Sequence, residues 1–298
     1  MSLAPRVVLV HRTTEYEELV ARHGTHGQAA FFLASRGRDI EEIAARHHRT
    51  RRALAEVASA VPLTWRQARV ERRDLDRFLF APEDVVVVVG QDGLVANVAK
   101  YLADQPVIGV DTDPGRNPGV LVRQAVDDAG ALLRSVLTGA VTDDLTMVEA
   151  VADDTQRLVA LNEIYLGAAG HATARYRLGL DGDGGVAEAQ ASSGVLVGTG
   201  TGATGWIRSV WQERGGGLPL PGPAETRLLW FVREAWPSPA TGTSLVAGEL
   251  TAPAALHLTV ESERLVAFGD GMETDALELT WGQSVRIGVC AARLRLVV

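Results

Sequence analysis

The valine run at residues 85–89 constrains the fold of this chain more than any other stretch. Five β-branched apolar residues in a row are typical of a parallel strand that is buried on both faces of its sheet. Gly90 and Gly93 then permit a tight turn, and apolar residues recur at helical spacing up to Leu102. With a second buried strand at 107–110, the pattern predicts a β-turn-α-β unit in a parallel sheet.

Asp92 stands at the carboxyl end of the first of these strands, which is where open α/β sheets bind ligands. One hypothesis makes Asp92 the N-cap of the following helix, because aspartate is a preferred capping residue. The other makes it a ligand-facing carboxylate beside helix amides that suit a phosphate. This stretch alone leaves both hypotheses open.

Composition excludes several classes of protein. A formal net charge of -8 over 298 residues gives no general attraction for nucleic acid or an anionic membrane. No apolar run approaches the roughly 20 residues of a membrane span, and a signal-peptide pattern is lacking. Cys290 is the single cysteine, which excludes an internal disulfide and a cysteine-based metal site. We therefore expect a cytoplasmic, enzyme-like protein.

Lys100 is the single lysine, and arginine carries the other basic charge. The Walker loop for ATP needs Gly-Lys followed by serine or threonine, whereas Lys100 is followed by Tyr101. If this protein handles ATP, it does so without that loop.

The first half of the chain alternates helical and strand patterns, which predicts a doubly wound parallel α/β domain over residues 1–140. The basic cluster at 46–49 fits a solvated helix face. The expected elements are a strand at 6–10, helices at 14–23 and 39–61, a strand at 64–70, a short helix at 72–80, a loop at 111–119 and a helix at 122–137.

The second half, residues 141–298, consists of short apolar runs separated by glycine and polar residues, and several runs alternate with period two. This pattern predicts a mainly antiparallel β domain. The expected strands lie at 147–151, 157–166, 174–180, 195–197, 256–260, 265–268, 277–281 and 285–289.

A loop of alternating glycine and threonine follows the expected strand at 195–197, and a helix is expected at 203–212. Such a loop lets a ligand approach the backbone and supplies hydroxyls and amides for phosphate or ribose; a flexible hairpin is the alternative. Gly200, Gly202 and Gly205 also match the dinucleotide fingerprint of hydride-transferring Rossmann enzymes. That motif is weak without a βαβ unit and a later acidic residue.

Together these stretches resemble the NAD kinase family, in particular its divergent branch that includes the mitochondrial NAD kinases. The resemblance runs in family order from about residue 85 to the C-terminus. Its segments are Gly90-Gln91-Asp92-Gly93, Ile108-Gly109-Val110-Asp111-Thr112-Asp113-Pro114, Ala160-Leu161-Asn162-Glu163, Ser193-Gly194 with Thr199-Gly200-Thr201-Gly202, and Gly269-Asp270-Gly271.

The resemblance implies an α/β domain, a β-rich NAD-binding domain and a site in the cleft between them. It implies ATP-dependent phosphorylation of the adenosine ribose 2'-hydroxyl of NAD(H) to NADP(H), with Mg²⁺ arriving on ATP, no metal held by the protein alone, and a homodimer or homotetramer. Asp92 would be the catalytic base. The nucleotide-binding residues would be Gly90, Gln91, Gly93, Asn162, Glu163, Thr199, Thr201, Gly202, Thr204 and Trp206.

Five positions depart from the family pattern. Gln91 replaces a glycine, Leu94 a threonine, Asp111 an asparagine, Ser193 an aspartate and Trp206 a tyrosine. A carboxylate at position 111 would repel phosphate unless it were protonated or metal-bound. A nucleotide-binding homologue without efficient kinase activity, acting as a sensor or scaffold, therefore remains an alternative. A kinase for a lipid or another hydroxyl acceptor is a further one.

Overall fold

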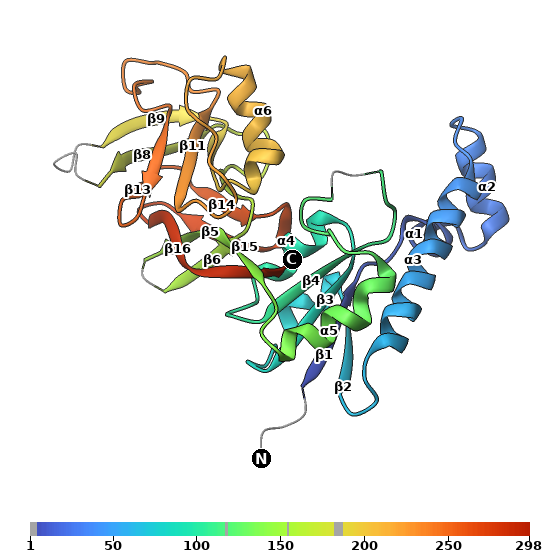
Figure 1. Ribbon diagram of the computed structural model, residues 1–298. Helices are drawn as coiled ribbons and strands as arrows, with labels where there is room; N and C mark the ends of the chain where they lie inside the picture. The colour runs from blue at the N-terminus through green and yellow to red at the C-terminus, as the bar shows by residue number, and fades with distance from the viewer. Residues whose placement is uncertain (1–4, 117–118, 154, 182–186) are drawn as a thin grey trace. The chain divides into compact units, whose positions relative to one another are not determined.

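The computed structural model describes residues 5–116, 119–153, 155–181 and 187–298; Asn117 and Pro118 of the expected loop at 111–119 lie outside these ranges. The chain divides into two compact units. The first runs to Asp143 and takes in Arg295–Val298, and the second is Asp144–Leu294. An α/β region with a parallel sheet is thus followed by an antiparallel, β-rich region (Figure 1).

The first unit is built from helices and parallel strands. Its elements are β1 (Arg6–His11), α1 (Glu15–His23), α2 (His26–Ala34), α3 (Ile40–Ala60), β2 (Arg66–Glu71), a 3-10 helix (Arg72–Arg77), β3 (Asp84–Gly90), α4 (Asp92–Ala99), β4 (Pro106–Asp111), a 3-10 turn (Val126–Asp128) and α5 (Ala129–Leu137).

The strands of the first unit run parallel in the order β2-β1-β3-β4, and the end of β16 (Ser284–Val297) continues this order beside β4. The valines 85–89 are at most 3% exposed, as expected for a strand buried on both faces. Val85, Val87 and Val89 pack with α3 and α5. Since α4 packs against β1, β3 and β4 as well, both faces of the sheet are covered.

Helix α2 was not expected from the sequence. Thr25 begins it by accepting a hydrogen bond from the Gln28 amide, and Ala29 and Leu33 pack against α1 and α3. A helix of nine residues that contains Gly27 has weak propensity, so tertiary packing supplies most of its stability.

The second unit is built almost wholly from strands. These are β5 (Thr142–Ala152), β6 (Gln156–Ala160), β7 (Glu163–Gly167), β8 (Ala174–Leu180), β9 (Glu188–Ser192), β10 (Gly194–Gly198), β11 (Arg227–Arg233), β12 (Ala247–Thr251), β13 (Ala255–Val260), β14 (Arg264–Gly269), β15 (Met272–Thr280) and most of β16, with a 3-10 turn (Gly202–Thr204) and helix α6 (Trp206–Glu213).

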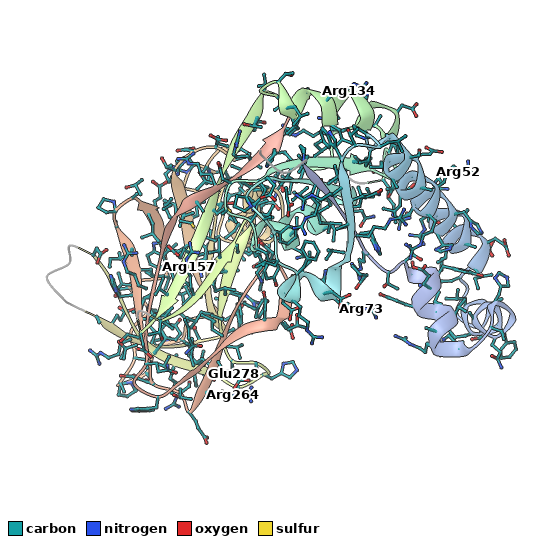
Figure 2. The ribbon with its side chains drawn as sticks, turned by 90° about the horizontal axis from the view of Figure 1, so that it is seen from below. Arg52, Arg73, Arg134, Arg157, Arg264 and Glu278 are labelled. Carbon is teal, nitrogen blue, oxygen red and sulfur yellow. The ribbon has the colours of Figure 1, made fainter. Side chains whose placement is uncertain are left out.

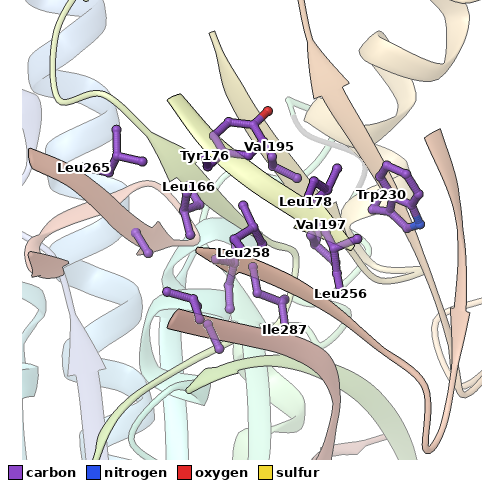
Figure 3. Close-up of a cluster of buried hydrophobic side chains, with 14 of the residues drawn as sticks. Leu166, Tyr176, Leu178, Val195, Val197, Trp230, Leu256, Leu258, Leu265 and Ile287 are labelled. Atoms are coloured by element: carbon purple, nitrogen blue, oxygen red, sulfur yellow. The ribbon is translucent and has the colours of Figure 1, made fainter. Parts of the chain in front are cut away.

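Two antiparallel layers bury the core of the second unit. One has the order β16-β13-β8-β9, and the other has the order β12-β11-β10-β7-β14-β15. Their inward side chains alternate with outward ones, so Tyr176, Val197, Trp230 and Leu258 meet in one cluster (Figure 3). The other face of the second layer packs against α6.

Several sequence predictions differ from the structure, among them the short helix expected at 72–80, which is a 3-10 helix that ends at Arg77. The helix expected at 122–137 begins only at Ala129, because the residues before it form a loop bound to β4. The strand expected at 157–166 is two strands, which are separated at Leu161 and Asn162. The terminal residues 294–298, whose apolar side chains favoured an oligomer, are instead paired within this chain through Arg295 and Leu296.

No helix among the described residues combines the length and the hydropathy that crossing a bilayer requires.

Candidate functional site

Asp92 is the first residue of α4, but its side chain serves another element. Its Oδ2 accepts a hydrogen bond from the Val120 amide at 3.0 Å, and its Oδ1 accepts from the amides of Leu121 and Val122 at 2.8 and 2.9 Å. The N-cap of α4 is Gln91. The hypothesis that Asp92 is a helix cap is therefore wrong, since its carboxylate holds the loop that follows β4.

The same loop is tied to β4 by its backbone. The Gln124 amide donates to the Gly109 carbonyl, and the Asp111 amide donates to the Gln124 carbonyl, both at 3.0 Å. A Cβ on Gly109 would lie 2.1 Å from the Leu121 carbonyl oxygen, so only glycine admits this approach. The Asp92 carboxylate is consequently fixed in position.

The Asp92 carboxylate can accept more hydrogen bonds than the three that these amides donate. An ionised carboxylate offers about four lone-pair directions, so roughly one direction on Oδ2 is left for another donor. The residue is also partly exposed. Asp92 can therefore accept a hydrogen bond from a ligand hydroxyl without releasing its loop.

The turn around Asp92 is open. Gln91 and Gly93 are exposed, and a Cβ added to Gly93 would meet no atom within 4 Å. Packing does not require glycine at position 93, which leaves room for a ligand to approach the backbone there. The binding roles of Gly90, Gln91 and Gly93 stay predictions.

Asp111 lies beside Gly90 in the strand register, and its Oδ1 accepts a hydrogen bond from the Asp113 amide at 2.8 Å. Asp113 in turn pairs with Arg49 of α3 at 2.8 Å and lies 4.0 Å from Arg116. Arginines thus offset the negative charge that Asp111 and Asp113 bring to this edge of the sheet.

The interpretation of residues 46–49 as a solvated helix face was wrong in part. Arg46 pairs with Glu15, and His47 Nδ1 lies 2.8 Å from the hydroxyl of Thr14, which caps α1. Burial lowers the pKa of His47. This stretch of α3 therefore fastens the loops that follow β1 and β4.

In the second unit, Asp270 holds the corner that precedes β7. Its Oδ1 and Oδ2 accept hydrogen bonds from the amides of Asn162 and Leu161 at 2.7 and 2.8 Å, and its own amide donates to the Glu163 carbonyl at 3.1 Å. Asp270 has a φ of 53°, a left-handed conformation that Asp tolerates better than most residues. The late Asp-Gly turn is thereby joined to the Asn-Glu segment.

Glu163 is the most perturbed acid of this corner. Burial and the neighbouring Asp270 carboxylate raise the pKa of Glu163 from 4.5 to about 8. Desolvation and a nearby like charge both disfavour ionisation of a carboxyl group. Glu163 is therefore protonated at neutral pH.

Thr199 fixes the Gly/Thr loop to the same corner. Its amide donates to the Asn162 carbonyl at 2.9 Å, and its hydroxyl donates to the Leu161 carbonyl at 2.6 Å. The same hydroxyl accepts from the amides of Thr201 and Gly202. Thr199 is fully buried, and its hydroxyl already makes its hydrogen bonds within this corner. Its expected part in binding is therefore to shape the loop and not to contact a ligand.

Two glycines of this loop are required by close packing. A Cβ on Gly202 would lie 2.3 Å from the Asn162 carbonyl oxygen, and one on Gly200 would lie 2.1 Å from the Gly222 carbonyl oxygen. The hairpin alternative for this loop was wrong, because the chain passes into α6. The context of a Rossmann fingerprint is missing too, since β10 lies antiparallel to β7 and β11.

The other two threonines differ from each other. Thr204 donates its hydroxyl hydrogen to the Thr201 carbonyl at 2.9 Å. The Thr201 hydroxyl is buried and finds no partner among the residues that the structure describes. A buried hydroxyl without a partner is costly, so Thr201 has capacity left for water or a ligand.

Trp206 belongs to the aromatic cluster on the face of the second layer that packs against α6. Its ring stacks on Tyr165 with centroids 5.8 Å apart, and the Arg233 guanidinium lies 5.3 Å from its centroid. Phe268 packs against Tyr165 from the neighbouring strand. Tyr165 is itself buried, so a planar ligand ring would meet the partly exposed Trp206 beside the positive charge of Arg233.

The structure thus brings together Asn162, Glu163, Thr199, Thr201, Gly202, Thr204 and Trp206 within the second unit, whereas Asp92, Gly90, Gln91 and Gly93 belong to the first. Sequence reasoning left Asp270 out of the site residues, although the glycines on either side of it signalled a tight turn. It also missed Tyr165 and Arg233, which carry no motif. No group of three or more metal-ligating side chains suited to a metal ion occurs among the described residues.

Comparison with known proteins supports the resemblance in part. No family model matches the chain. The mitochondrial NAD kinase 2 proteins of Homo sapiens, Rattus norvegicus and Mus musculus are each 31% identical to it over 123 residues. That match takes in 39% of this chain and 28%, 29% and 27% of the three relatives. The chain therefore spans less than a third of the curated relatives, to which it is distantly similar.

Proposed function

We propose that this protein is an NAD kinase-like phosphotransferase that uses Mg²⁺-ATP to phosphorylate the adenosine ribose 2'-hydroxyl of NAD or NADH. The observation that carries the proposal is the convergence of residues 161–163, 199–206 and 269–271 in one corner of the second unit. These segments lie far apart in the sequence and carry the motifs that resemble the family. The similarity to NAD kinase 2 supports the same activity.

Asp92 would act on the nucleophile. In the reaction the ribose 2'-oxygen bonds to the γ-phosphorus of ATP, the bond from that phosphorus to the β,γ-bridging oxygen breaks, and ADP leaves. The hydroxyl proton passes to the remaining lone pair of Asp92. Phosphoryl transfer depends mainly on positioning and charge neutralisation, so a carboxylate held by three amides suits the task of orienting a hydroxyl.

The second unit would bind the dinucleotide. Trp206, which the buried Tyr165 supports by stacking, offers a partly exposed ring for a planar group, and Arg233 offers a positive charge for a phosphate. Asn162, Glu163 and Thr201 offer polar groups for the ribose or adenine. Mg²⁺ would arrive with the ATP phosphates, as Mg²⁺ usually binds through substrate phosphates and few protein ligands.

The test is incubation of the purified protein with Mg²⁺-ATP and either NAD or NADH, followed by an NADP-specific dehydrogenase that reports the product. NADP(H) that depends on both substrates supports the proposal. Phosphorylation of a lipid or another alcohol without NADP(H) would favour a different acceptor.

A nucleotide-binding homologue without efficient turnover is the second candidate. It is favoured by the exposed Gln91 in the turn before Asp92 and by the carboxylates of Asp111 and Asp113 beside that turn. Binding of NAD with no NADP(H) under any donor condition would support it. Self-association as a dimer or tetramer and a cytoplasmic location remain predictions.

A further inference from the structure

Glu163 has a carboxyl group for which the described part of the chain supplies no partner. It begins β7 opposite Gly198 of β10, and it is only partly exposed. Among the described residues, no side chain or amide makes a hydrogen bond or ion pair with this carboxyl group. A carboxyl group that is largely removed from water and left unpaired is costly, which points to a ligand that pairs with it.

Asp270 is the charged group that acts on Glu163 among the described residues. The amides of Leu161 and Asn162 stabilise the Asp270 carboxylate in its ionised form. The Asp270 amide donates to the Glu163 carbonyl, which fixes the two residues beside each other. Ionisation of Glu163 would therefore place a second negative charge next to one that the fold already holds.

We propose that Glu163 binds the dinucleotide as a neutral acid, donating its O–H to an oxygen or ring nitrogen of the adenosine half, and that Asp270 is a positioning residue that, together with the burial of Glu163, keeps it neutral. This inference rests on the proposed function and specifies how its acceptor substrate is held. A dinucleotide offers ribose oxygens and adenine nitrogens as acceptors, while its pyrophosphate is anionic. A donor without charge can meet those acceptors without repelling the pyrophosphate.

The proposal makes binding depend on a proton. Burial and Asp270 raise the pKa of Glu163 to about 8, so the free protein begins to lose the donor in mildly alkaline solution. NAD must then bind with uptake of a proton. By linkage, affinity falls toward tenfold for each pH unit above that pKa, to about thirtyfold weaker at about pH 9.5.

The experiment is calorimetric titration of NAD into the full chain from about pH 6.5 to about 9.5. At about pH 8.5 it is repeated in two buffers of different ionisation enthalpy, which measures proton uptake. We expect uptake of about 0.7–0.8 of a proton per NAD bound, as the ionised fraction of such an acid requires. Affinity that is flat to pH 9.5 without proton uptake would overturn the proposal and leave the proposed function intact. Absence of NAD binding at every pH would overturn both.

Two variants separate Glu163 from other acids. Glu163→Gln keeps a neutral donor, so the variation of its affinity with pH should shrink to less than about threefold. Glu278→Gln is the matched control, because Glu278 is an exposed carboxylate that pairs with Arg264 on the surface of the same unit (Figure 2). Its profile should follow that of the wild type. An unchanged alkaline loss in Glu163→Gln would assign the proton elsewhere and contradict the proposal.

Asp270→Asn tests the positioning role. Removal of its charge should lower the pKa of Glu163 and move the loss of affinity to lower pH by about one unit. A loss of affinity at the same pH as the wild type would contradict that role. If this variant does not fold, the pH profiles of Glu163→Gln and Glu278→Gln still decide whether Glu163 carries the proton.

Discussion

Asp92 in the first unit and Asp270 in the second both hold a distant loop through backbone amides, but the two carboxylates differ in what lies beside them. Each carboxylate accepts backbone amides from a distant loop: Asp92 from Val120, Leu121 and Val122, and Asp270 from Leu161 and Asn162. Asp92 stands in an open turn and keeps an acceptor direction for a ligand. Asp270 lies beside the partly buried acid Glu163 and adds to the effect of burial in raising its pKa.

The comparison teaches that a motif aspartate can act directly or through another residue. In the proposed reaction Asp92 would contact the reacting hydroxyl, whereas burial and the neighbouring Asp270 together raise the pKa of Glu163. Packing around the two turns differs likewise, since Gly93 faces open space and Gly202 faces the Asn162 carbonyl.

Asp92→Asn should lower kcat for NADP formation by about three orders of magnitude, because the proton acceptor is lost. The amide replacement also turns an N–H₂ toward at least one of three backbone N–H groups, so the free energy of unfolding should fall by about 1–3 kcal/mol. Urea unfolding and turnover measure both effects. Asp74→Asn, an exposed aspartate of the same unit, is the control. Near-normal turnover in Asp92→Asn would remove Asp92 from the chemistry.

Gly202→Ala should lower the free energy of unfolding by about 2–4 kcal/mol, because its Cβ would lie 2.3 Å from the Asn162 carbonyl oxygen. Gly93→Ala is the matched variant. Because no atom lies within 4 Å of the added Cβ, the unfolding temperature of Gly93→Ala should equal that of the wild type or lie slightly above it, since alanine favours a helix. Thermal unfolding of both variants checks the contrast, and equal losses would contradict it.

Glu163→Gln should stabilise the protein in neutral and alkaline solution. Since the pKa of Glu163 is raised from 4.5 to about 8, the native state holds a proton that the unfolded state releases between these pH values. The unfolding free energy of the wild type therefore falls as pH rises through this window and levels off above it. The glutamine variant does not undergo this loss, so its free energy of unfolding should exceed that of the wild type by about 2–3 kcal/mol at about pH 6.5, with no gain near pH 4. Urea unfolding at several pH values tests the sign, and a gain that does not vary with pH would contradict it.

Gln91→Gly probes the open turn and has the smallest expected effect. If the Gln91 amide donates to a donor phosphate, its removal should lower kcat/KM for ATP about tenfold, which is roughly 1.4 kcal/mol. If the side chain only narrows the approach, the same change should raise kcat/KM. Stability should change little because Gln91 is exposed. Unchanged kinetics would place the phosphates away from this turn.

The fold of the first unit could be predicted well because its signals are local. The valine run predicted β3, and Thr14 and Asp39 predicted where α1 and α3 begin. The prediction failed where a distant partner decides. Residues 122–125 have helical character, yet the chain there is bound to β4, and residues 120–122 donate to Asp92.

The site in the second unit was predictable as a set of motifs but not as an arrangement. Asn162 and Glu163 were expected inside one long strand, and only Asp270, more than a hundred residues later, shows why the strand breaks there. Tyr165 and Arg233 meet Trp206 through sheet packing that no spacing reveals. The raised pKa of Glu163 follows from burial and from Asp270, which are properties of the folded chain.

The most direct test of the proposed phosphotransferase activity traces the phosphoryl group itself. The purified protein is incubated with NAD and Mg²⁺-ATP, and the products are resolved by phosphorus NMR. We predict a new phosphate monoester on the 2'-oxygen of the adenosine ribose, formed in step with ADP and abolished by Asp92→Asn. ATP that stays intact beside bound NAD, or a phosphoryl group that passes only to water, would contradict this function.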